Sequence, residues 1–307
     1  MEAPLHKWKA IFLALRDMGV LFVNLSGGEV TTYSEFDALI AYLQEIELPF
    51  YLTSNGVIPK DRLQRIMANK VLMGMKISLD GISPESYLHV RDPVRKNEVI
   101  YKTVMNTLKQ LKESNIFVEI ATLVHSKNVS ELMRYPGVLA SLGIKKWDLG
   151  LLMPEGRGLA NKDALTTGLD EFKFDKAFVQ KISEEAERHG IFVSFGDLKF
   201  ETLDKPIFEC GAGIDFMSIQ YDLSVHPCPL LPYSRFKDKY EFKLNDARDI
   251  ESAWRSKPFL DWIDQKINGC PTCALRQKCG RCIIQLGEEG KSDPYENISA
   301  CFHASLS

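Results

Sequence analysis

The first 209 residues of this 307-residue chain lack cysteine, although the whole chain contains seven. The sequence also lacks an apolar run of the roughly 18 residues that a membrane-spanning helix needs, and it does not begin with the features of a secretory signal. We therefore expect a cytoplasmic protein with no membrane partner. Because the cytoplasm is reducing, disulfides are not expected, and an odd number of cysteines cannot all pair within one chain.

A strong excess of charge of either sign is also absent. The chain has 38 Lys and Arg against 41 Asp and Glu, a formal net charge of -3, and no long basic run. Nucleic acid is therefore not expected as a partner, because phosphate binding relies on clustered basic residues. With 45% hydrophobic residues the composition is that of a globular protein. Since every cysteine follows residue 209, we predict two domains, 1–204 and 205–307.

Helical and strand patterns alternate through the cysteine-free part. Short apolar runs between turn residues predict strands, apolar enough to be buried on both faces, at 20–25, 50–53, 71–78, 117–124 and 147–152. Apolar spacings of three and four residues predict helices at 5–17, 33–45, 60–69, 97–113, 130–142 and 170–189. This alternation predicts an α/β fold with a parallel sheet, either open or curled into a full or partial barrel. Because the chain opens on a helix, a first strand and its loop are expected to be missing.

Polar or glycine-rich residues follow the predicted strands, where ligands bind in such folds. Two glycines precede Glu29 and allow a backbone to approach an amino group closely, although taken alone they are better explained by a tight turn between strand and helix. Ser78 and Asp80 at another strand end can bind a ribose, but Asp-Gly is also a common turn pair. Arg91 can bind a carboxylate with two parallel hydrogen bonds, or it is simply solvated.

The succession LSGGE, LTSNG, ISLDG and LLMPEGRG at strand ends resembles the radical SAM superfamily over about the first 200 residues. The resemblance implies a partial (β/α)6 TIM-like barrel missing its first strand, with S-adenosylmethionine as cofactor. By this resemblance the Gly-Gly-Glu residues would bind the methionyl amine of the cofactor, and the serine would bind its ribose or carboxylate. The arginine would bind the carboxylate, and the aspartate would bind the ribose. The cofactor-binding candidates are therefore Gly27, Gly28, Glu29, Ser78, Asp80 and Arg91.

The CxxxCxxC loop that holds the catalytic 4Fe-4S cluster in this superfamily is absent here. One cause explains the missing loop and the missing strand, because the two would be adjacent in sequence. We expect that the sequence begins downstream of both. The alternative is a relative that has lost the cluster.

The cysteines of the last third are grouped around Cys270-x2-Cys273-x5-Cys279-x2-Cys282. Thiolates two residues apart on a turn can reach one metal. Structural zinc sites usually separate two such pairs by about 15 to 20 residues and would leave three of the seven cysteines without a metal. The pattern therefore favours one or two 4Fe-4S clusters, with zinc as the alternative.

The cysteine order also resembles the SPASM domain, a small iron-sulfur module, over residues 205–307. The module would be a small cysteine-rich α+β domain, with a hairpin at 216–221 and 223–225 and short helices at 250–255 and 259–267. The resemblance implies one cluster on Cys270, Cys273, Cys279 and Cys301, and a second on Cys210, Cys228 and Cys282. Leu223 stands where the family often has glycine, and His226 is expected to be a surface histidine rather than a ligand.

Together the resemblances imply a radical SAM enzyme that modifies a peptide or protein side chain by hydrogen abstraction. Its partners would be that substrate and an electron donor such as a flavodoxin or ferredoxin. A second hypothesis is a non-catalytic iron-sulfur protein that relays electrons, or binds peptide, for a complete homologue. A third is a zinc-stabilised binding domain.

Overall fold

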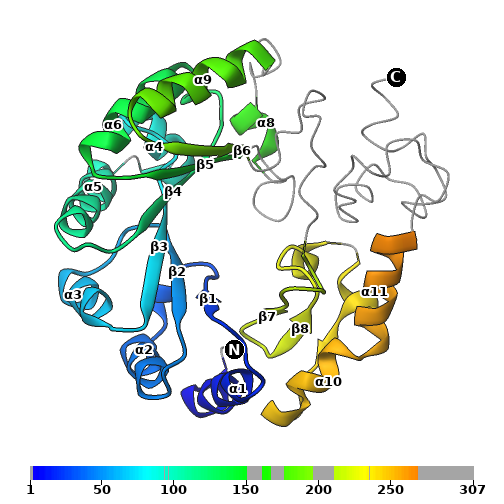
Figure 1. Ribbon diagram of the computed structural model, residues 1–307. Helices are drawn as coiled ribbons and strands as arrows, with labels where there is room; N and C mark the ends of the chain where they lie inside the picture. The colour runs from blue at the N-terminus through cyan, green and yellow to red at the C-terminus, as the bar shows by residue number, and fades with distance from the viewer. Residues whose placement is uncertain are drawn as a thin grey trace. The chain divides into compact units, whose positions relative to one another are not determined.

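The computed structural model describes residues 3–92, 94–95, 97–150, 161–166, 176–195, 211–234 and 236–268 (Figure 1). Contacts within the chain divide it into two compact units. We call Gly19–Phe200 the sheet unit, and Met1–Met18 together with Glu201–Ser307 the cysteine unit, because it contains every cysteine. Helix α1 (Leu5–Asp17) groups with the cysteine unit. The predicted domain boundary after residue 204 lies outside the described residues.

The sheet unit is built on one six-stranded sheet in which every neighbouring pair is parallel and the strand order follows the sequence (Figure 1). The strands are β1 (Val23–Leu25), β2 (Phe50–Ser54), β3 (Leu72–Ser78), β4 (Val118–Leu123), β5 (Lys146–Gly150) and β6 (Phe192–Phe195). The predicted α/β fold with a parallel sheet is confirmed, and the sheet is consistent with a partial TIM-like barrel. Five strands agree with the sequence prediction to within a few residues, and β6 was not among the predicted strands.

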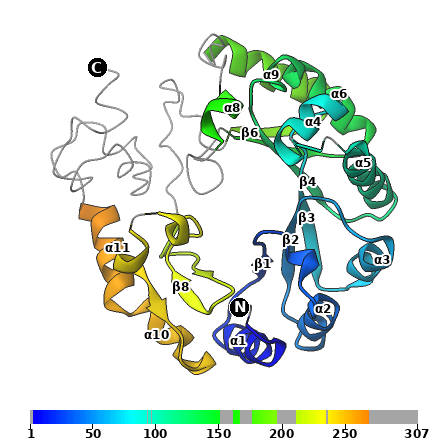
Figure 2. The same cartoon turned by 180° about the vertical axis from the view of Figure 1, so that it is seen from behind.

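Helices connect successive strands, and most of them lie on the outer side of the curved sheet, as Figures 1 and 2 show. Those the sequence predicts are α2 (Phe36–Glu45), α3 (Lys60–Ala68), α5 (Glu98–Lys112), α6 (Tyr135–Ser141) and α9 (Lys176–Arg188). Two short helices, α4 (Pro84–Arg91) and α8 (Lys162–Thr166), and the 3-10 turn η1 (Val30–Thr32) were not predicted. The predicted helix at 130–142 consists of the 3-10 turn η2 (Val129–Arg134) followed by α6. None of the helices in the described ranges is long and apolar enough to cross a bilayer.

The two faces of this sheet differ in chemistry. The side chains facing the helices, such as Ile77, Ile120 and Trp147, are fully buried and form the core. The opposite, inner face carries charged residues. Lys76 is paired in register with Glu119, so the two side chains lie on the same face of the sheet. Lys76 also lies two residues before Ser78, and residues two apart on a strand share a face. The prediction that these strands are apolar on both faces is therefore wrong for the inner face.

The described part of the cysteine unit contains a small antiparallel sheet of β7 (Ser218–Ile219), β8 (Ser224–His226) and β9 (Phe242–Lys243). The predicted hairpin is confirmed as β7 and β8, and β9 is additional. Its helices are α10 (Ile250–Trp254) and α11 (Lys257–Asn268), close to the predicted bounds, with 3-10 turns η3 (Leu231–Tyr233), η4 (Lys237–Tyr240) and η5 (Ala247–Asp249).

Leu223 lies in the turn between β7 and β8 with a φ of +66°. This left-handed conformation is favourable for glycine and unfavourable for leucine, because the side chain of an L-residue crowds its own carbonyl there. The turn thus gives a physical reason for glycine at this position.

Candidate functional site

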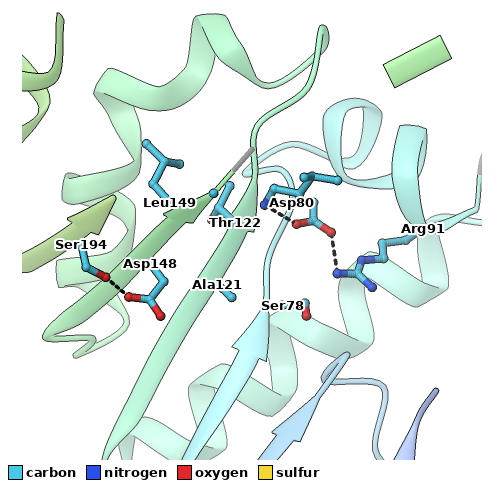
Figure 3. A pocket seen from close by; sticks show the side chains of 10 residues that line it. Ser78, Asp80, Arg91, Ala121, Thr122, Asp148, Leu149 and Ser194 are labelled. Atoms are coloured by element: carbon cyan, nitrogen blue, oxygen red, sulfur yellow. Dashed lines mark hydrogen bonds and ion pairs between the residues drawn. The ribbon is translucent and has the colours of Figure 1, made fainter. Parts of the chain in front are cut away.

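A cavity of about 380 Å³ lies at the carboxyl-terminal ends of β3, β4 and β5 and beside β6 (Figure 3). Ser78, Asp80 and Arg91 form one side, while Asp148 and Ser194 form the other. The volume falls in the range of small-molecule sites, and the strand ends are where ligands bind in parallel sheets. The structure therefore brings three of the six predicted cofactor residues into one pocket. Their role in binding a cofactor stays a prediction.

Asp80 is the most constrained of the three. Its side chain is buried, and its Oδ2 lies 2.5 Å from Nη2 of Arg91, at the end of α4. Its Oδ1 accepts a hydrogen bond of 2.8 Å from the backbone N–H of Leu123, at the end of β4 (Figure 3). Because a guanidinium has five N–H donors, Arg91 can bind Asp80 and still donate to an acidic group in the pocket.

The Gly27-Gly28-Glu29 segment follows β1 and does not appear among the described residues that line this cavity. Gly27 has a φ of +149°, which requires glycine, and a side chain at either glycine would meet no atom within 4 Å. The Glu29 carboxylate accepts hydrogen bonds from Ser54 Oγ at 3.0 Å and from the backbone N–H of Asn55 at 2.7 Å. Glu29 therefore joins the ends of β1 and β2, and open space lies beside the two glycines.

Tyr87 was not predicted to belong to the site. It is fully buried in α4, and its hydroxyl has no hydrogen-bond partner among the described residues. Burial raises its pKa to about 12; Arg91 opposes that shift, while Asp80 and Glu29 add to it. The tyrosine therefore lies within electrostatic range of both ends of the predicted cofactor site. The sequence does contain a signal for α4, because Ser83 and Ser86 form a capping box around a first-turn proline.

Four ionisable residues form a row across the inner face of the sheet, which we call the charge row: Lys76, Glu119, Lys146 and Asp148. Nζ of Lys76 lies 2.6 Å from Oε1 of Glu119 and also contacts the Asp148 carboxylate. Nζ of Lys146 lies 2.8 Å from Oε2 of Glu119. On the far side, Ser194 donates a hydrogen bond to Asp148 (Figure 3).

The pKa values of the two acids in the charge row shift in opposite directions. Burial alone would raise the pKa of Glu119, but its contacts with Asp148, Lys146 and Lys76 outweigh burial and lower it to about 2. The pKa of Asp148 is raised, first by burial and then by its contact with Glu119. The sequence signal for the row is a charge at every second position, as in Lys146 and Asp148, within runs that otherwise look apolar.

Cys228 is the one predicted metal ligand within the described residues; the other six, Cys210, Cys270, Cys273, Cys279, Cys282 and Cys301, lie outside them. Cys228 is buried in a core cluster with Tyr240 and Trp262. Its sulfur accepts a hydrogen bond of 3.5 Å from the backbone N–H of Leu230. Across the described ranges no three His, Cys, Asp or Glu side chains are grouped so as to hold a metal ion.

His226 is completely buried in β8, so the prediction of a surface histidine is wrong. Its Nε2 lies 3.2 Å from Oγ of Ser224, and its Nδ1 has no hydrogen-bond partner among the described residues. Burial lowers the pKa of this imidazole. The alternating pattern of a three-residue strand is too short to reveal such burial from sequence.

Residues 2–134 match the family model of the Radical SAM superfamily. The chain is 26% identical to the antilisterial bacteriocin subtilosin biosynthesis protein AlbA of Bacillus subtilis (strain 168), over 88% of this chain and 58% of AlbA. It is 21% identical to the PqqA peptide cyclase of Granulibacter bethesdensis, over 99% of this chain and 81% of the cyclase. The chain thus spans 58% of AlbA and 53% of a second relative, the sporulation killing factor maturation protein SkfB of Bacillus subtilis (strain 168).

Solved structures show a similar fold. Streptococcus suis SuiB bound to S-adenosylmethionine matches with a TM-score of 0.69 at 19% identity, over 98% of this chain and 70% of SuiB. The protein anSMEcpe with bound AdoMet matches with a TM-score of 0.68 at 14% identity, over 98% of this chain and 82% of that protein. At these identities the matches establish the fold.

Proposed function

We propose that this chain, in which residues 2–134 carry a radical SAM superfamily domain, acts with S-adenosylmethionine and 4Fe-4S clusters to modify a peptide or protein side chain by hydrogen abstraction. The observation that carries the proposal is the pocket at the strand ends, where Ser78 and the Asp80–Arg91 pair lie together. Bound S-adenosylmethionine would supply the adenosyl radical, and the chain's own residues would bind and orient it.

The pocket residues fit S-adenosylmethionine in size and in polar groups. A volume of about 380 Å³ suits a nucleoside, Arg91 offers donors to a carboxylate, and the hydroxyl of Ser78 can bind a ribose or carboxylate oxygen. In this proposal the open space beside Gly27 and Gly28 takes the methionyl amine, with backbone groups as its partners.

The iron-sulfur part of the proposal rests on the cysteine pattern and on Cys228. A backbone N–H that donates to a cysteine sulfur, as that of Leu230 does here, stabilises a thiolate and is one of the ways a protein tunes a cluster. Residues 1–209, in contrast, hold no thiolate and do not fit the catalytic cluster. Their contribution is therefore confined to binding and positioning.

A peptide or protein substrate is supported by what similar proteins are named for. AlbA is a bacteriocin biosynthesis protein, the PqqA peptide cyclase acts on a peptide, and one SuiB structure contains its precursor peptide SuiA. We extend that substrate class to this chain, with a flavodoxin or ferredoxin as electron donor. The polar inner face of the sheet suits a peptide, because it offers hydrogen-bonding groups beside the pocket.

A second candidate is a non-catalytic iron-sulfur partner that relays electrons or binds peptide for a complete homologue. The absence of cysteine from residues 1–209 favours it. The two functions differ in one product, because only the enzyme forms 5'-deoxyadenosine from S-adenosylmethionine.

The test begins with anaerobic reconstitution of the full chain, followed by measurement of iron, acid-labile sulfide and zinc. Both cluster functions require iron and sulfide, whereas one zinc per chain with no sulfide would leave a zinc-stabilised domain. Because residues 1–209 hold no cysteine, the coding sequence upstream of residue 1 then separates the two cluster functions. An in-frame strand followed by CxxxCxxC would supply the ligands of the catalytic cluster and support the enzyme, whereas an upstream stop codon would favour the relay.

The pocket assignment has a separate test with a matched control. We expect Arg91→Ala to weaken binding of S-adenosylhomocysteine at least about tenfold, because a charged hydrogen bond contributes about 1.5 to 3 kcal/mol. Arg95→Ala removes a nearby arginine that does not line the cavity, and it should leave the affinity unchanged. Equal affinities for both variants would place the ligand elsewhere. Isothermal titration calorimetry measures both.

A further inference from the structure

The loop after β4 reaches back to the end of β3 and holds the backbone of Asp80. The carbonyl oxygen of Asp80 accepts two side-chain hydrogen bonds, one from His125 Nε2 at 2.7 Å and one from Asn128 Nδ2 at 2.9 Å. Both side chains are completely buried. Asn128 Nδ2 also donates to the carbonyl of Leu123 at 2.7 Å, so the same amide joins the ends of β3 and β4.

The preceding carbonyl is held in the same way. Leu79 O accepts hydrogen bonds from Thr122 Oγ1 at 2.9 Å and from the Tyr135 hydroxyl at 3.3 Å. Thr122 is itself fixed, because its Oγ1 accepts a hydrogen bond of 2.9 Å from Trp147 Nε1. Each of the two carbonyls that follow β3 therefore has two side-chain donors. We call these four donors, Thr122, His125, Asn128 and Tyr135, the β3 clamp.

The hydrogen bonds also define the protonation state of His125. Its Nδ1 accepts a hydrogen bond of 3.2 Å from the backbone N–H of Lys127, so the ring proton is on Nε2 and points to Asp80 O. Burial lowers the pKa of His125, which favours this neutral form. The groups that face the ring are His89, stacked at 5.3 Å between centroids, Asp80 and Glu131.

The clamp acts on the residue that places Arg91 in the pocket. Asp80 has its carbonyl held by His125 and Asn128, its Oδ1 held by a backbone N–H and its Oδ2 held by Arg91. A carboxylate fixed at these points keeps the guanidinium in one position. Loss of His125 as a donor would leave the Asp80 carbonyl with Asn128 as its one remaining side-chain donor in this set, and the carboxylate and Arg91 would be held less tightly.

We infer that His125 and Asn128 are positioning residues that hold Asp80, and through it Arg91, in the geometry that the ligand pocket requires. The identity of the ligand rests on the proposed function, whereas the hold on Asp80 does not. The inference therefore has one test without ligand and one with ligand.

The first test compares hydrogen exchange of the ligand-free full chain and three variants. His125→Gln keeps a donor close to the position of Nε2, whereas His125→Leu removes it. Asn69→Ala is the control. Asn69 precedes the start of β3, at the end of the strand opposite to Asp80, and its Nδ2 donates a hydrogen bond of 2.8 Å to the carbonyl oxygen of Ile40. We expect the leucine variant to lose exchange protection at the Leu123 N–H, which donates to Asp80, by at least about tenfold. The other two variants should keep it. Equal protection in all four proteins would overturn the inference.

The second test measures the affinity of the same proteins for S-adenosylhomocysteine. His125→Leu should weaken binding about tenfold, His125→Gln less than about threefold, and Asn69→Ala should not change it. The wild-type affinity should also fall as the pH drops through the pKa of His125. Protonation would put a second N–H on the ring, at Nδ1, where it would face the donor N–H of Lys127 and remove that hydrogen bond. The glutamine variant lacks that step.

The outcomes of the two tests separate the two claims. If the wild-type chain does not bind S-adenosylhomocysteine, the proposed cofactor is wrong and hydrogen exchange alone decides the clamp. If it binds, and the leucine variant binds equally well at every pH, the positioning role is wrong even where exchange at Leu123 has increased.

Discussion

The two units of this chain hold their candidate functional groups in different ways. In the sheet unit, Glu29 and Asp80 are fixed by hydrogen bonds from the neighbouring strand ends, over a core to which β2, β3, β4 and β5 each contribute fully buried side chains. The described part of the cysteine unit has strands of two or three residues and two small core clusters, one of which contains Cys228. Its buried His226 leaves Nδ1 without a partner among the described residues.

This difference leads to an expectation about which unit depends on a bound group. A sheet that satisfies its own charges and strand ends can form its site before any ligand arrives, and the site is then preorganised. A small module with little apolar core usually needs a metal or a covalent link to be stable, because too little surface is buried on folding. The cysteine unit is therefore expected to gain its stability from the clusters proposed for it.

Removal of the metal is the change with the largest expected effect on this contrast. When a reconstituted chain is treated with a chelator, residues 211–268 should lose most of their hydrogen-exchange protection, because binding of the clusters is part of their folding free energy. Strands β2 to β5 should keep theirs. Exchange measured by mass spectrometry before and after chelation tests both expectations, and equal protection of the cysteine unit would contradict the contrast.

A substitution in the charge row tests whether the sheet unit depends on its own internal ion pairs. Lys76→Met leaves the carboxylates of Glu119 and Asp148 side by side without the cation between them, and we expect the unfolding free energy to fall by about 2 kcal/mol at pH 7. Lys146→Met is the matched control. Its lysine contacts one of the two acids and is more exposed, so its loss should be below about 1 kcal/mol. Denaturant titration measures the unfolding free energy of both variants. Equal losses would show that Lys76, between the two acids, contributes no more than Lys146.

The pH dependence of stability sharpens the same point. The pKa of Glu119 is about 2 in the folded chain against 4.5 in the unfolded one, so its ionised form stabilises the fold above pH 4.5. That stabilisation is lost as the pH falls from 4.5 towards 2, and Asp148, whose pKa is raised, partly offsets the loss. Glu119→Gln should remove much of this pH dependence. An unchanged slope in that variant, from denaturant titrations between pH 2 and 6, would contradict the assignment.

Asp80 tests the preorganised site itself. Asp80→Ala removes the partner of Arg91 and the acceptor of the Leu123 N–H, and we expect binding of S-adenosylhomocysteine to weaken about thirtyfold. Asp80→Asn keeps an acceptor but loses the charge, so it should weaken binding about tenfold. Isothermal titration calorimetry measures the affinity of the wild type and of the two variants. If the asparagine variant binds as well as the wild type, the charge of Asp80 does not hold Arg91.

Sequence patterns predicted the frame of the sheet unit better than its site. The order of five strands and the helices between them followed from periodicity, and the rule that ligands bind at strand ends pointed to Ser78 and Asp80. The pairing of Asp80 with Arg91 did not follow, because it depends on the direction of α4, an element that the pattern missed. The charge row was missed for a related reason, since charges inside apolar runs reveal their common face only once the register is known.

The smallest predicted effect distinguishes the two units by their strained turns. Leu223 in the cysteine unit has a φ of +66°, and Glu47 in the sheet unit has a φ of +55°. Glycine relieves the backbone strain at either position but also gives the unfolded chain more freedom, so Leu223→Gly and Glu47→Gly should each stabilise by about 0.5 to 1 kcal/mol. If the units unfold separately, calorimetry should show each variant raising the melting temperature of its own unit. A shift of both transitions by either variant would mean that the two units unfold as one, and the contrast between them would then describe local structure without separate stability.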